Sequence, residues 1–141
     1  MTYKKALQAY QRAQHSVMPP RFMEQAAFAQ AISMLKIARE DITAFREYSD
    51  ALKYNQRMWT FIQSSLADDS YSVPVAIRSN LLNLSIFIDR STISALTTPN
   101  ASKLDALIDI NINISRGLTS ATAFPEAMQD DRLPPHGFLP N

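Results

Sequence analysis

The chain has no cysteine and only two glycines among its 141 residues. Without cysteine it has no disulfides, no thiolate nucleophile and no cysteine-ligated metal. The two glycines, Gly117 and Gly137, are too few for the turns and bulges of most sheet proteins or for a glycine-rich phosphate loop. These scarcities favour an all-α protein and disfavour the disulfide-rich, thiol-dependent and phosphate-loop classes.

The sequence also lacks a dominant charge and a long apolar run. Its 14 Lys and Arg against 13 Asp and Glu leave a net charge of +1, which disfavours charge-driven RNA binding. The most apolar window, Leu81 to Ile88, is interrupted by polar residues and falls far short of the ~20 residues of a membrane helix. Two lysines near the N-terminus precede no uninterrupted apolar segment, so we expect no signal peptide. We therefore expect a soluble, cytoplasmic protein without membrane insertion.

What is present is typical of one globular domain. Apolar residues make up 46% of the chain and charged residues 19%, which predicts a packed core. Towards the end, prolines accumulate at positions 125, 134, 135 and 140. We predict a single-domain bundle of about five helices over residues 1–120, followed by a flexible, proline-rich tail over residues 121–141.

Apolar spacing places the first three helices. A first helix is predicted from Tyr3 to about His15. A seam of large and small residues at alternating three- and four-residue spacing predicts a long second helix, with a break near Tyr48 to Asp50 or, since no glycine or proline stands there, only a bend. The seam consists of Phe28, Ala31, Leu35, Ala38, Ile42 and Phe45. A third helix is predicted from about Leu52 to Leu66.

A fourth helix should start near Pro74 and be apolar on most sides. Its main stripe is widened by Leu82, Ile86 and Phe87, so we expect it to be nearly enclosed by the bundle. The stripe itself consists of Ile77, Leu81, Leu84 and Ile88.

The next segment, residues 104–118, fits two structures. Isoleucines alternate with polar residues from Ile108 to Ile114, which is a strand pattern. A helix also fits, with Asn100 or Ser102 as its cap and Gly117 at the position where a helix commonly ends. Because no second strand is available to satisfy an isolated one, we predict the helix.

No group of residues predicts catalysis, a cofactor or a metal. His15 and His136 lack carboxylates at ligand spacing. Three pairs of neighbouring acids could supply an acid and a base, but adjacent residues do not face one another, and helix ends explain them better. The pairs are Glu40–Asp41, Asp68–Asp69 and Asp130–Asp131. We expect a protein that is not an enzyme.

Trp59 and Asn111 each carry a polar group on an apolar helix face, so each should find a hydrogen-bond partner if it is buried. Trp59 could serve as core or as an anchor for a partner, and Ile62 on the same face favours the core. Asn111 lies on an apolar helix face and needs a partner, such as a facing backbone group or Arg78. Methionines could line a groove, although they are more often core residues; they are Met18, Met23, Met34 and Met58.

Three stretches, in order, resemble the FlaF family of flagellar regulators from alphaproteobacteria: RMWTFIQSSL at 57–66, VPVAIRSNLLNLSIFIDR at 73–90 and LDALIDININISRGL at 104–118. Upstream, MPPRFMEQAAFAQAISMLKIAR at 18–39 also resembles the family, so the likeness spans roughly residues 3–118. The matching positions, which are our candidates for family-motif or partner-binding residues, are Arg57, Trp59, Pro74, Arg78, Asn80, Ile110, Asn111, Gly117 and Leu118. Ser65 and Val73 depart from the pattern, in place of an acidic residue and a leucine.

The resemblance implies a role in flagellin synthesis or secretion alongside the translational regulator FlbT, and no catalytic residue. Two hypotheses follow. In the first, a chaperone or adaptor binds a terminal helix of flagellin in an apolar groove. In the second, a post-transcriptional regulator acts on flagellin messenger RNA, directly or with FlbT; the nine Lys and Arg against five Asp and Glu up to Arg57 favour it weakly.

Overall fold

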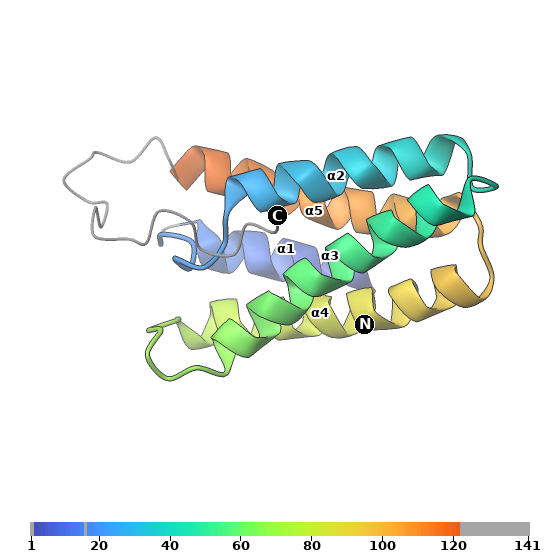
Figure 1. The fold of residues 1–141 in the computed structure, drawn as a ribbon. Helices are drawn as coiled ribbons and strands as arrows, with labels where there is room; N and C mark the ends of the chain where they lie inside the picture. Colours follow the sequence, from blue (N-terminus) through green and yellow to red (C-terminus); the bar gives the residue numbers. More distant parts are fainter. Residues whose placement is uncertain (1, 16, 122–141) are drawn as a thin grey trace.

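A computed structural model describes residues 2–15 and 17–121, and within these ranges the chain forms five α-helices and no strand (Figure 1). The all-α prediction is thus confirmed, including the helical reading of residues 104–118. The predicted tail lies, from residue 122 onward, outside the described residues. The helices are α1 (Tyr3–Gln14), α2 (Gln25–Glu40), α3 (Phe45–Leu66), α4 (Val75–Thr97) and α5 (Ser102–Ala121).

Short polar side chains mark where helices begin. The Thr2 hydroxyl accepts a hydrogen bond from the Lys5 amide at 3.3 Å, which satisfies one of the free donors in the first turn of α1. The predicted cap Asn100 accepts from the Ser102 amide at 2.8 Å at the start of α5. Pro74 directly precedes α4, where the absence of its N–H removes no helical hydrogen bond.

The helices pack as a closed ring of neighbours. Helix α2 packs on α5, α5 on α1, α1 on α4, α4 on α3, and α3 on α2 again, and α5 also contacts α4 directly. Helices α2 and α4 do not contact each other, and they lie on opposite sides of the bundle in Figure 1. All five helices supply side chains to one core, in which Phe28, Trp59 and Leu84 are fully buried.

The predicted boundary between the second and third helices is wrong. The break lies at residues 41–44, and the predicted break at Tyr48 to Asp50 falls inside α3, where Tyr48 is buried. The Asp41 carboxylate accepts a hydrogen bond from the Thr43 amide at 3.0 Å, a local turn that competes with helical hydrogen bonding. Phe45, placed by its spacing in the seam, instead starts α3 and is 52% exposed.

Two further expectations also need correction. Helix α4 is not enclosed, because Leu82 and Ile86 are exposed on its outer side. Gly117 does not end a helix, because α5 continues to Ala121. A β-carbon at Gly117 would lie 3.0 Å from the Gln14 Oε1 atom, so its small size permits a close approach of α1.

Candidate functional site

The outer side of α4 carries a row of exposed apolar side chains. Val75 is 79% exposed, Leu82 37%, Ile86 49% and Ile93 61%. Their spacing of seven, four and seven residues places all four within about 40° of one another at ~100° per residue. From first to last, the row is about 27 Å long at ~1.5 Å per residue. We call these four residues the α4 stripe.

The stripe exists because α4 has two apolar faces. Its inner face buries Ile77, Leu81 and Ile88 in the core. Helices α1 and α3 flank α4 on its two sides, and no other helix of the described chain packs over its outer face. Leu82 and Ile86 lie one turn apart, and Val75 and Ile93 extend the row by two turns at either end, so the exposed apolar residues share one line along α4.

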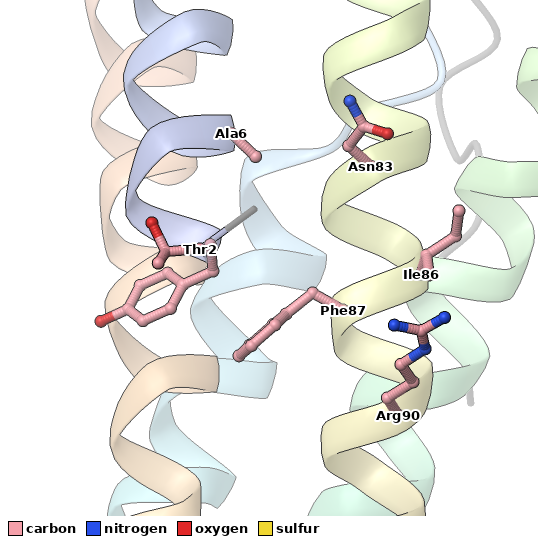
Figure 2. Close-up of a pocket in the computed structure, with 7 residues that line it drawn as sticks. Thr2, Ala6, Asn83, Ile86, Phe87 and Arg90 are labelled. Carbon is pink, nitrogen blue, oxygen red and sulfur yellow. The ribbon is translucent and has the colours of Figure 1, made fainter.

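A groove of about 180 Å³ runs between α1 and α4 beside the stripe (Figure 2). In Figure 2, Phe87 reaches from α4 towards α1, while Ile86, which belongs to the stripe, lies on the far side of α4 from α1. The groove is lined by Thr2, Tyr3, Ala6, Asn83, Ile86, Phe87 and Arg90. It therefore continues the apolar surface of the stripe and adds polar groups to its edge.

Contacts of Tyr3 with α4 and α5 fix the position of one wall of this groove. The Tyr3 and Phe87 rings lie with their centroids 5.1 Å apart, and the Tyr3 hydroxyl donates to the Asp109 carboxylate on α5 at 3.1 Å. Burial, followed by the hydrogen bond to Asp109, raises the pKa of Tyr3, so its phenol stays protonated. The contact thus ties α1 to both α4 and α5.

Basic residues without neighbouring acids in the sequence occur on α1, and one basic residue of α4 lines the groove. Residues 1–23 contain no acidic residue, and α1 carries Lys4, Lys5 and Arg12. Arg90 on α4 is exposed and makes no hydrogen bond or ion pair within residues 2–15 and 17–121. A second hollow on α1 is lined only by polar side chains; they are Gln8, Gln11, Arg12 and His15.

Four of the predicted family-motif residues lie in the core and not on a surface. Trp59, Ile110, Asn111 and Leu118 are buried. The Trp59 indole N–H donates to the Asn111 side-chain oxygen at 3.1 Å, and the Asn111 amide donates to the side-chain oxygen of Asn55 at 2.7 Å. Trp59 is therefore a core residue, as expected, and the partners of Asn111 are Trp59 and Asn55 instead of Arg78.

The remaining motif residues are dispersed. The Arg78 guanidinium donates to the Leu66 carbonyl and so joins the end of α3 to the start of α4. Gly117 faces Gln14 of α1. Arg57 and Pro74 are exposed and Asn80 is half-buried. The structure brings Trp59 and Asn111 together, but it does not gather all nine positions into one site.

The four methionines between residues 17 and 121 form no common groove. Met23 and Met58 are buried in the core, Met34 is half-buried, and Met18 is 39% exposed. The α4 stripe, by contrast, was visible in the sequence through the spacing of Val75, Leu82, Ile86 and Ile93. The same helix also carries the stronger inner stripe, and for that reason the sequence predicts Leu82 and Ile86 as part of a wider buried face.

The described part of the chain lacks two kinds of feature. Among those residues, no three His, Asp or Glu side chains gather as metal ligands. No helix there is long and apolar enough to cross a membrane.

The fold and the stripe define a class of small, all-helical proteins with an exposed apolar row on one helix. A family model described as flagellar protein FlaF matches residues 6–118. The chain therefore belongs to the FlaF family of flagellar proteins, as its sequence motifs indicated. No curated protein and no solved structure matches the chain.

Proposed function

We propose that this flagellar protein acts by binding and not by catalysis, as a cytoplasmic chaperone or adaptor that holds flagellin on the α4 stripe. The observation that carries the proposal is the exposed row of Val75, Leu82, Ile86 and Ile93 beside a groove. Membership of a flagellar family supports flagellin as the partner. An amphipathic helix laid along such a row would bury apolar surface on both chains.

The size of the stripe specifies the partner segment. A row of about 27 Å accommodates about five turns of a partner helix, or ~18 residues. Seven-residue intervals on α4 match a helix with apolar residues at the same intervals, packed at a shallow angle. Covering such a helix would keep flagellin from polymerising before its use, which is the mechanism we propose for a chaperone.

A matched pair of isoleucines provides the test. Ile93 lies on the stripe and is 61% exposed, whereas Ile37 lies on α2 and is 62% exposed. We expect Ile93→Glu to weaken flagellin binding about five- to thirtyfold, because an exposed side chain of this size contributes ~1–2 kcal/mol when covered. Ile37→Glu should leave binding unchanged, because α2 makes no contact with α4.

Binding is measured by co-purification and titration with full-length flagellin and with flagellin lacking either terminal segment. Loss of the complex on removing one segment would locate the bound helix. The absence of any complex at micromolar concentration would reject the proposal. Equal effects of the two isoleucine variants would reject the stripe as the docking surface.

A second candidate function is regulation of flagellin messenger RNA, directly or with FlbT. It is favoured by the outer side of α1, where Lys5 and Arg12 are exposed and no acidic residue occurs. Direct RNA binding through such a surface should weaken steeply with added salt. If no salt-sensitive shift of the messenger is seen, only the indirect route, in which the protein contacts FlbT, is left.

A further inference from the structure

We infer that Arg90 pairs with an acidic side chain on the bound helix and thereby fixes the direction in which that helix lies on α4. This inference rests on the proposed function, because it specifies the chemistry of the partner that the α4 stripe receives. The partner is an amphipathic helix with an apolar row and a carboxylate on the flank that faces α1.

The first observation is the position of Arg90. It follows Ile86 by one helical turn and lines the groove beside the stripe (Figure 2). Its guanidinium makes no ion pair within the described residues. The neighbouring carboxylate of Asp89 accepts a hydrogen bond from the Gln63 side chain of α3 at 3.0 Å, on the other flank of α4. Arg90 is thus a cation at the edge of an apolar row, available to a carboxylate on a docked chain.

The second observation is the charge around it. Helix α1, which forms the opposite side of the groove, carries basic residues and no acid. The two acids of α5 that face neighbouring helices are already engaged, Asp109 by the Tyr3 hydroxyl and Asp105 by the Arg39 guanidinium. A helix with an acidic flank towards α1 is therefore attracted, and one with a basic flank there is repelled.

The third observation is the shape of the apolar surface. The stripe is a single row about 40° wide, with Asn83 and Arg90 at its edge. A narrow row with polar edges fits the seam of one helix. Insertion into a lipid surface uses a broad apolar face, which this side of α4 does not present.

The fourth observation is that Arg90 lies near one end of the stripe. It stands three residues before Ile93 and fifteen after Val75. A partner carboxylate can reach it only when the corresponding end of the partner's apolar row lies over Ile93. The other direction would place that carboxylate near Val75, far from Arg90. One ion pair therefore selects one of two directions that the apolar contacts alone permit.

The test compares charge variants of Arg90 in the full chain bound to full-length flagellin, by titration at low and moderate salt. We expect Arg90→Gln to weaken the complex about fivefold and Arg90→Glu about thirtyfold or more, both with a shallower salt dependence than the unchanged protein. Arg116→Glu on α5, another exposed arginine, is the matched control and should bind normally. Reversing one acidic residue of the bound flagellin segment to lysine should restore binding to Arg90→Glu.

The outcomes separate the two proposals. Failure of the unchanged protein to bind flagellin would overturn both. Normal binding by Arg90→Glu would overturn the role of Arg90 and leave the stripe standing. Vesicles of phosphatidylcholine and phosphatidylglycerol form a second arm. Vesicle binding that Arg90→Glu abolishes, together with unaltered flagellin binding, would identify the surface as a membrane contact and overturn the inference.

Discussion

Tyr10 places a hydroxyl in the core of the bundle without a hydrogen-bonding partner in the described part of the chain. The side chain is 1% exposed, and burial raises the pKa of its phenol. An unsatisfied buried hydroxyl costs free energy that a phenyl ring of the same shape would not. The buried ring of Tyr10 therefore stabilises the fold by packing, and its unpaired hydroxyl cancels part of that stabilisation.

We expect Tyr10→Phe to raise the free energy of unfolding by about 1 kcal/mol at pH 7, as measured by urea denaturation. Since the folded pKa of Tyr10 is raised, its protonated form stabilises the fold below about pH 10, the unfolded value, and this contribution declines as pH rises further. Between pH 7 and about pH 10.5, Tyr10→Phe should consequently lose less free energy of unfolding than the unchanged protein does. Tyr3→Phe is the opposite control: it loses the bond to Asp109 and should be destabilised by about 0.5–1 kcal/mol.

Gly117 is a second residue whose replacement should change the stability of the protein. It lies in the interior of α5, where glycine is less favourable than alanine by about 1 kcal/mol. The nearest atom to a new β-carbon is the end of the Gln14 side chain, which can shift by a few tenths of an ångström. Gly117→Ala should therefore raise the thermal midpoint slightly, whereas Gly117→Leu should lower it. A loss of stability in Gly117→Ala would show that Gln14 is held too firmly to move.

Between elements, one polar connection joins α5 to α3 inside the apolar core. Asn111 accepts from the Trp59 indole and donates to Asn55, and all three side chains are fully buried. A polar group in such a place permits one register of the two helices, because a shifted register would leave these groups unsatisfied. These hydrogen bonds therefore fix how α3 and α5 are aligned along their lengths.

Asn111→Leu should destabilise the protein by about 2–3 kcal/mol, because it leaves the Trp59 N–H and the Asn55 oxygen buried without partners. Chemical denaturation measures the loss, and the fluorescence maximum of Trp59, the only tryptophan, reports the lost hydrogen bond. Adding Asn55→Leu should recover part of the loss. A variant as stable as the unchanged protein would contradict this account of the pair.

The positions of most helices could be predicted from the sequence, whereas one helix boundary and the contacts between helices could not. Four helix positions followed from apolar spacing, and α5 followed from the lack of a second strand. The boundary at residues 41–44 did not, because Ile42 and Phe45 continue the seven-residue pattern through a turn made by Asp41 and Thr43. The partners of Asn111 were also beyond reach, since they depend on how α3 and α5 pack. The spacing of the α4 stripe can be read from the sequence, but its exposure depends on which helices flank α4, and no local pattern records that.

For the molecule as a whole, the ring of helices leaves each one dependent on two or more neighbours. Among the five described helices, α1 contacts only α4 and α5, and it contributes Leu7 and Tyr10 to the shared core. Removing any helix from such an arrangement exposes the core side chains of its neighbours. A core drawn from all five helices favours one cooperative unfolding transition.

We therefore expect helix content, followed by circular dichroism, and Trp59 fluorescence to give the same denaturant midpoint. Trp59 packs edge-on against Phe28 of α2, with ring centroids 6.0 Å apart, so its signal reports the centre of the bundle while circular dichroism reports every helix. Ile93→Glu should leave both midpoints unchanged, because Ile93 lies outside the core, whereas Ile88→Glu should lower both together. Circular dichroism that falls before the fluorescence would mean that a helix, most simply α1, detaches while the Trp59 core is intact. Coincident curves would establish that the α4 stripe is presented by a single cooperative unit, whose outer face can change without loss of its fold.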